Sequence, residues 1–137
     1  GIVLDGAFIV VKAFLPHLKS SGAGAVINIG GMTGHTGAKR RPHVIAAKSG
    51  LVGLTKALAH DLGEHGVTVN CVVPGLIDTV RVAGSSVMPA HHTASRTLVG
   101  RLGTPDDIAA AVRHLAGPGG RYVTGQTIHV NGGAYLG

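Results

Sequence analysis

The sequence predicts an α/β fold of three layers, in which helices cover both faces of a parallel sheet. Short apolar segments rich in β-branched residues alternate with longer segments of helical periodicity, an order typical of parallel strands joined by crossover helices. Glycine accounts for 23 of the 137 residues and aromatic residues for only 3%, which favours tight strand-to-helix turns over an aromatic sandwich core. The length allows one domain and leaves no room for a second.

The first predicted elements are a helix and a strand. Apolar residues between positions 5 and 18 recur at spacings of three and four, which indicates an amphipathic helix. Ala25–Ile29 is a short apolar run bounded by glycines and is typical of a buried strand. The glycine-rich residues 30–42 that follow are expected to form a flexible loop.

A long helix and a second strand come next. Residues 43–64 are rich in alanine, leucine and valine and contain no proline, so they predict the longest helix, with Gly66 as its terminator. Residues 67–73 form a second buried strand that Pro74 stops. A strand, a helix and a strand within about fifty residues make a βαβ unit, which implies parallel strands and a right-handed crossover.

The last third of the chain predicts one more helix and one more strand. Residues 76–103 carry small residues and arginines, and we expect loop and short helix there. Thr104 is suited to cap a helix, Pro105 to occupy its first position, and the two acids that follow to meet the positive end of its dipole. This helix is expected to end at Ala116, and residues 126–130 predict a third strand.

Charge and cysteine content limit the function classes. The net charge of +6 favours a basic surface that keeps the protein soluble or attracts anionic ligands. Only residues 39–41 form a basic run and aromatic residues are nearly absent, so nucleic acid is not an expected partner. The single cysteine, Cys71, excludes an intramolecular disulfide and fits a reduced, cytoplasmic setting. No segment has the pattern of a membrane span or a signal peptide.

Three segments carry a resemblance to a known family: residues 46–59 (AAKSGLVGLTKALA), 69–75 (VNCVVPG) and 122–133 (YVTGQTIHVNGG). In these segments, and over essentially the whole chain, the sequence resembles the short-chain dehydrogenase/reductase family. The resemblance implies a Rossmann-like, doubly wound parallel sheet. It also implies that the three segments are the active-site helix, the strand whose end faces the nicotinamide, and the last strand of the sheet.

The resemblance implies that residues 1–137 are one partial domain. The family begins with three or four strand–helix units that carry a glycine-rich dinucleotide turn, whereas this sequence starts in the helix after the fourth strand. Residues 30–34 follow a strand but lack the G-x-G-x-x-G spacing and a helix opening at its end. We therefore expect a truncated form, or a piece of a longer protein, without the N-terminal dinucleotide-binding strands.

The family's catalytic residues are a Tyr, a Ser and a Lys, together with an Asn that orders a water. Lys48 matches the Lys, but Val44, Gly31 and Val3 stand where the Tyr, the Ser and the Asn would be. Valine cannot donate the proton that carbonyl reduction needs. The resemblance thus implies that this chain does not react by the family's usual route and is a candidate pseudoenzyme.

Three other polar residues are candidates for a replacement function. His43 adjoins Val44 and can titrate near neutrality. However, it precedes Lys48 by five residues, which point about 140° apart on a helix, so a surface histidine is the favoured interpretation. Thr33 and His35 can offer a hydroxyl and an imidazole to a substrate, although a plain loop role is favoured for both.

The resemblance assigns cofactor-binding residues for NAD or NADP, without distinguishing the two. Lys48 would hold the nicotinamide ribose, and Pro74, Gly75, Ile77 and Thr79 match the segment whose backbone groups and Thr hydroxyl meet the carboxamide.

Other candidate binding residues are histidines and arginines. No metal site is predicted, because the densest pair, His91 and His92, has no cysteine or carboxylate cluster near it in the sequence. Arg96 and Arg101 are candidates for an acidic group of a substrate, with solvated surface arginines as the simpler interpretation.

Three functions remain open. The first is an NAD(P)-dependent oxidoreductase acting on a small alcohol or carbonyl substrate. The second is a non-catalytic binding or oligomerisation module, because the family's helices in this region form subunit interfaces and Phe8, Val11 and Phe14 would otherwise be exposed; a homo-oligomer is the expected state. The third is a divergent enzyme; the residues that it would use are Thr33, His35, His43 and Lys48.

Overall fold

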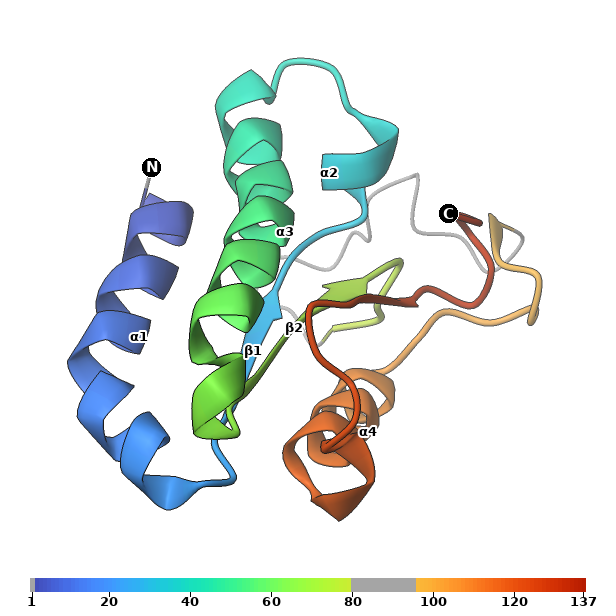
Figure 1. Cartoon of the computed structure of the whole chain (residues 1–137). Coiled ribbons are helices and arrows are strands. Elements are labelled where there is room, and N and C mark those ends of the chain that lie inside the picture. Colours follow the sequence, from blue (N-terminus) through green and yellow to red (C-terminus); the bar gives the residue numbers. More distant parts are fainter. Residues whose placement is uncertain (1, 80–95) are drawn as a thin grey trace.

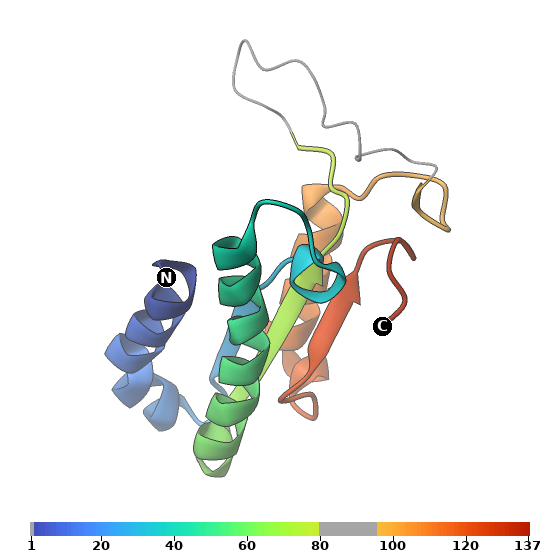
Figure 2. The same ribbon diagram turned by 90° about the horizontal axis from the view of Figure 1, so that it is seen from above.

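The computed structural model describes residues 2–79 and 96–137, which form a parallel sheet between helices (Figure 1). In chain order the elements are α1 (Ile2–Ser21), β1 (Ala25–Ile29), α2 (Thr33–Thr36), α3 (Pro42–Leu62), the 3₁₀ turn η1 (Gly63–His65), β2 (Thr68–Pro74), α4 (Pro105–Ala116), the 3₁₀ turn η3 (Pro118–Gly120) and β3 (Thr127–Val130). The strands lie in the order β1-β2-β3, and both pairs are parallel. Helices α1 and α3 cover one face and α4 the other (Figure 2), which confirms the predicted three-layer fold.

The central strand β2 organises the core. Val69, Cys71 and Val73 point toward α3, because alternate residues of a strand face the same side of a sheet. There they pack against Leu51 and Leu62 of that helix, in two apolar clusters. All these side chains are buried, so the face of the sheet under α3 is rigid enough to position the residues at the strand ends.

Asn70 alternates with these residues along β2 and links the strand to the segment before β3. Its side-chain amide donates a hydrogen bond to the carbonyl of Val123 at 2.8 Å, and its side-chain oxygen accepts one from the amide of Gln126 at 3.0 Å. The residue is fully buried. Burying an amide is tolerated because both of its polar atoms have partners.

Most predicted boundaries agree with the structure within a few residues. Strand Ala25–Ile29 is confirmed to the residue, whereas α1 extends three residues beyond each predicted end. Gly66 has φ of 70°, the left-handed conformation expected of a terminator. The predicted cap is also confirmed, since the Thr104 hydroxyl accepts from the amide of Asp107, whose carboxylate accepts from the amide of Thr104.

Two expectations need correction. Residues 30–42 are not a plain flexible loop, because a helical turn, α2, opens at Thr33 and packs against α3; the Ser49 hydroxyl donates to the carbonyl of Gly34 at 2.8 Å. Val11 does not form an exposed apolar row with Phe8 and Phe14. Its side chain is buried on the inner side of α1, whereas the two rings are exposed.

One stretch of the predicted loop region cannot be compared. Residues 80–95, which include His91 and His92, lie outside the described residues. Within the described ranges, no helix is long and apolar enough to cross a membrane.

Candidate functional site

A cleft of about 530 Å³ lies at the carboxyl ends of β1 and β2, the edge of a parallel sheet at which α/β proteins bind ligands. We call it the strand-end cleft. It is lined by Gly30, Gly31, Met32, Thr33, Thr36, Gly37, Ala38, Lys39, Arg41, Lys48, Pro74, Gly75, Leu76 and Arg96. The volume falls in the range of pockets for small molecules and parts of cofactors.

At the cleft, the side chain of Lys48 lies directly against Gly31. A Cβ atom added to Gly31 would lie 2.7 Å from both Cδ and Nζ of Lys48, so the lysine occupies the room that a side chain at position 31 would take. Lys48 is half-buried on α3. Its backbone is held close to α2, where a Cβ at Gly34 would lie 3.3 Å from Cβ of Lys48. The absence of a side chain at position 31 thus brings the ammonium group to the cleft.

Gly75 forms the opposite part of the cleft, just after β2. Its amide donates to the carbonyl of Val130 at 3.0 Å and extends the pairing of β2 with β3. A Cβ at this position would lie 2.8 Å from Cα of Asn131, so only glycine fits without a shift of the backbone. Together with Pro74, it presents main chain rather than side chain to the cleft.

A group of three rings lies beside this region but does not line the cleft. His35 of α2 and His129 of β3 contact edge to face, with ring centroids 4.6 Å apart, and Tyr135 lies 5.2 Å from His129. Burial, followed by the charge of His35, lowers the pKa of His129. Among the residues that the structure describes, the buried Nδ1 of His129 has no hydrogen-bond partner. His129 and Tyr135 were not predicted, because nothing in their local sequence indicates that the two residues meet His35.

A smaller pocket of about 200 Å³ adjoins the start of α4. Ile77, on its wall, pairs with Gly103. Nη1 of Arg101 lies 2.7 Å from a carboxylate oxygen of Asp107. This ion pair and the backbone of Thr104 hold the pKa of Asp107 far below its usual range. Arg101 is therefore engaged with α4 and is not a free cation for a substrate.

The structure brings some of the predicted site residues together. Thr33, Lys48, Pro74 and Gly75 all line the strand-end cleft, on three separate elements. Their shared position is a matter of geometry, and their function as cofactor-binding residues stays a prediction.

Other predicted residues lie elsewhere. His43 is exposed in the first turn of α3, and Thr79 is exposed after β2; neither lines the cleft. Val44 is half-buried on α3, and Val3 is exposed on α1.

The residues present fit the nicotinamide end of a dinucleotide. Pro74 and Gly75 leave main chain open to a flat ring, and the Lys48 ammonium can donate to ribose hydroxyls. A pyrophosphate is normally held by a glycine-rich turn at a helix N-terminus. Such a turn does not occur in residues 2–79 and 96–137, where the only helix that opens after a glycine-rich strand end is the four-residue α2.

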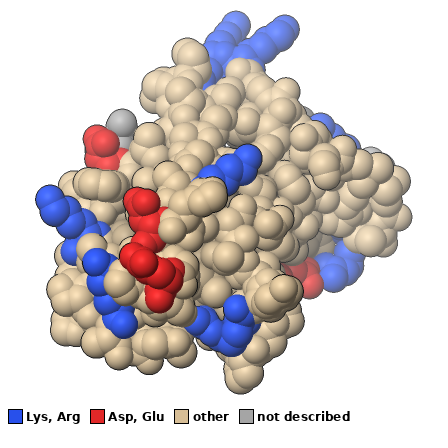
Figure 3. Space-filling view, in the orientation of Figure 1, with Lys and Arg blue, Asp and Glu red and all other residues tan. Residues whose placement is uncertain are grey.

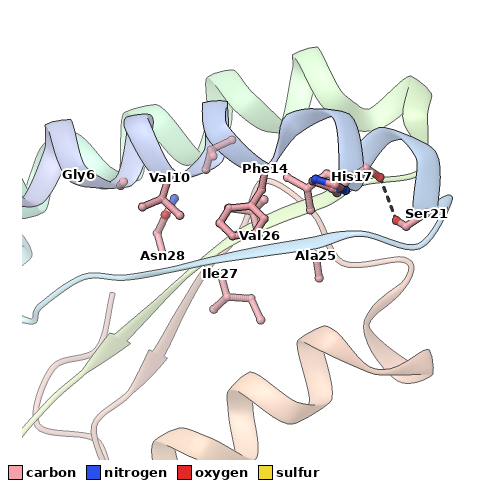
Figure 4. Close-up of a pocket in the computed structure, with 12 residues that line it drawn as sticks. Gly6, Val10, Phe14, His17, Ser21, Ala25, Val26, Ile27 and Asn28 are labelled. Atoms are coloured by element: carbon pink, nitrogen blue, oxygen red, sulfur yellow. Dashed lines mark hydrogen bonds between the residues drawn. The ribbon is translucent and has the colours of Figure 1, made fainter.

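A second large hollow, of about 550 Å³, runs between α1 and β1. Figure 4 shows Val10 and Phe14 of α1 directed toward the strand, near Val26 and Asn28. Within the part of the chain that the structure describes, β1 pairs only with β2, so its other edge is unpaired. This hollow is apolar and lies away from the strand-end cleft.

Comparison with known proteins gives consistent matches. Residues 1–135 match the family described as enoyl-(acyl carrier protein) reductase. The chain is 42% identical over 125 residues to the 3-oxoacyl-[acyl-carrier-protein] reductase FabG of Vibrio harveyi, covering 91% of this chain and 51% of the relative. It is 40% identical over 133 residues to FabG of Haemophilus influenzae, covering 97% of this chain and 55% of the relative.

A solved structure matches equally well. A short-chain dehydrogenase/reductase from Brucella melitensis, described as a glucose/ribitol dehydrogenase, superposes with a TM-score of 0.85 at 35% identity, covering 99% of this chain and 53% of that one. The chain thus spans about half the length of the proteins that it matches.

Proposed function

Because the chain belongs to the short-chain dehydrogenase/reductase family, we propose that it supplies the catalytic half of an NAD(P)-dependent oxidoreductase for a small alcohol or carbonyl substrate. One observation carries the proposal: Lys48, Gly31, Pro74 and Gly75 converge on one cleft at the strand ends. When bound, the cofactor would supply a hydride to the carbonyl carbon of the substrate.

In this proposal Lys48 takes over the function of the missing tyrosine. An ammonium group carries three N–H donors, so Lys48 can hold the carbonyl oxygen and transfer a proton to it. The product is the alcohol, and the neutral amine regains its proton from water at the open side of the cleft. The support for this assignment is the position of Nζ, which a Cβ at Gly31 would approach to 2.7 Å. Thr33 provides a second hydrogen-bond donor on the same cleft.

The proposal places the pyrophosphate on elements other than these 137 residues. We therefore expect the chain alone to bind NADH or NADPH weakly, through the nicotinamide end only. A dissociation constant in the low micromolar range, measured by titration calorimetry on the chain alone, would show that this expectation is wrong.

The activity itself is tested by isotope transfer. The chain is joined to the N-terminal dinucleotide-binding half of a family member and supplied with NADH or NADPH deuterated at the transferring position, together with a panel of small ketones and aldehydes. We expect deuterium at the carbinol carbon of one or more products, detected by mass spectrometry. A fusion that binds the cofactor but transfers no deuterium to any carbonyl would refute the proposal.

Lys48 is tested with two variants of this fusion. Lys48→Met should lower turnover by about 100-fold or more, because it removes both the hydrogen bond and the proton. Lys48→Arg keeps the positive charge but does not release a proton near neutrality. We therefore expect this variant to bind the cofactor as the wild type does and to lose turnover.

A second candidate function, a self-associating module, is favoured by exposed apolar side chains of α1. Phe8, Ile9 and Phe14 on this helix are each at least half exposed. Exposed apolar side chains on one helix are typical of an interface. Sedimentation velocity at high micromolar concentration tests this candidate: Phe8→Ser with Phe14→Ser should leave a monomer, and a wild-type chain that is already monomeric would exclude it.

A further inference from the structure

We propose that the substrate carries a negatively charged group, a carboxylate or a phosphate, which Lys39 and Arg41 recognise at the mouth of the strand-end cleft. This inference deepens the proposed function and rests on it for the identity of the site. The inference goes beyond the proposed function because it names the chemical class of the substrate.

The charges around the cleft are of one sign. Lys39, Arg41, Lys48 and Arg96 line it, and no aspartate or glutamate is among the lining residues that the structure describes. Lys39 and Arg41 are exposed, whereas Lys48 lies deeper, against Gly31. In a ligand with an anionic group at one end and a carbonyl at the other, the anionic group would thus meet Lys39 and Arg41, and the carbonyl would meet Lys48.

The chain around Lys39, Arg41 and Lys48 contains no acidic residue. No aspartate or glutamate occurs between positions 6 and 60, a stretch that includes β1, α2 and most of α3. Asp78, the acid that lies closest to the lining residues along the chain, is exposed and does not line the cleft. Figure 3 shows basic side chains, without acidic ones among them, at the end of the molecule where α2 connects to α3. Walls of one charge raise the local concentration of ligands of the opposite charge.

The backbone between α2 and α3 separates Arg40 from its two neighbours. Arg40 does not line the cleft, and its φ of 64° is the only positive value among the described residues other than glycine. This turn allows both Lys39 and Arg41 to line the cleft although a third basic residue lies between them.

Enclosure favours a small anion over a flat acidic protein surface as the ligand. The cations line a cleft of about 530 Å³, in which Lys48 lies against Gly31. An acidic protein surface would reach Lys39 and Arg41 but would leave Lys48 uncovered.

The test uses the 137-residue chain without cofactor and two ketones that differ in charge. Levulinate carries a carboxylate, and methyl levulinate is its neutral ester; inorganic phosphate is the third probe. Binding is followed by NMR shifts of the backbone amides of Gly30, Gly31 and Thr33. We expect levulinate to bind about 10-fold tighter than its ester, with the difference shrinking at high salt. If phosphate shifts the same amides more strongly than levulinate, the recognised group is a phosphate.

Matched variants separate recognition at the cleft from general attraction. The double variant Lys39→Gln/Arg41→Gln should reduce the preference for levulinate to about twofold or less, whereas Arg40→Gln, which removes a charge from the same turn, should keep it.

Four results would overturn the inference. They are equal binding of the acid and the ester, binding of neither anion, an Arg40→Gln effect as large as that of the double variant, and tight binding of an acyl carrier protein without binding of either anion. Because turnover is not measured, an inactive fusion that retains this selectivity would refute the proposed function alone.

Discussion

Gly75 offers the sharpest test of how the fold builds the cleft. In Gly75→Ala the new methyl group would lie 2.8 Å from Cα of Asn131, about 0.6 Å inside the 3.4 Å at which ordinary contact begins, and closer still to Cβ of Asn131. Neither neighbour can move freely, because the Gly75 amide is bonded to Val130 and the Asn131 side chain donates to the carbonyl of Tyr135. The strain must therefore displace backbone.

The expected cost follows from this clash. Overpacking in a rigid site costs about 1–3 kcal/mol. For a chain of this length, each kcal/mol lost lowers the melting temperature by about 3–5 °C. Urea unfolding followed by circular dichroism measures the change in the free energy of unfolding. The amides of Val130 and Asn131 should also shift in NMR spectra, because the strand ends move apart.

Gly53→Ala is the matched control. Gly53 lies inside α3, and a Cβ there meets nothing within 4 Å. Replacing glycine by alanine in a helix interior stabilises by about 0.5–1 kcal/mol. Opposite signs for the two substitutions support the reasoning, whereas a change below about 0.5 kcal/mol in Gly75→Ala would refute it.

Further predictions concern a helix cap, a histidine and the cysteine. Thr104→Ala should destabilise the chain by about 1 kcal/mol in thermal unfolding, since it removes the cap of α4; no change in melting temperature would count against the cap. Because burial lowers the pKa of His129, its contribution to stability is complete above the unfolded value of about 6.5 and is lost as the pH falls through the folded value. The urea concentration at the midpoint of unfolding should thus decrease between pH 7 and pH 5, and it should decrease less in His129→Phe. An equal decrease in the two proteins would contradict this. Burial also raises the pKa of the Cys71 thiol, so iodoacetamide should modify the folded chain at least about 100-fold more slowly than the unfolded chain, measured by mass spectrometry; equal rates would show that Cys71 is accessible.

The parts of the fold that the sequence predicted well are those specified locally. Strand Ala25–Ile29 is a β-branched run between glycines, and the start of α4 follows from a Thr cap and a proline in the first turn. Helix α2 was missed because a four-residue helical turn has little intrinsic stability. It depends on its packing against α3, including the bond from Ser49 to Gly34, and such a contact cannot be deduced from local pattern.

The candidate site was predicted in part for the same reason. The motifs identified Lys48 and Gly75 one at a time, and the structure adds that both line one cleft. The contact of Lys48 with Gly31 depends on the path of a long side chain, and the meeting of His35 with His129 joins segments 94 positions apart. Neither has a signature in residue spacing.

The central claim is that Lys48, and not His43, is the reactive group of the strand-end cleft. The most direct measurement is the turnover of Lys48→Met and His43→Ala in the fusion described above, with a ketone that the wild type reduces. The account predicts a loss of about 100-fold or more for Lys48→Met and a change within about twofold for His43→Ala, because His43 is exposed outside the cleft. A large loss in His43→Ala with activity retained in Lys48→Met would contradict it.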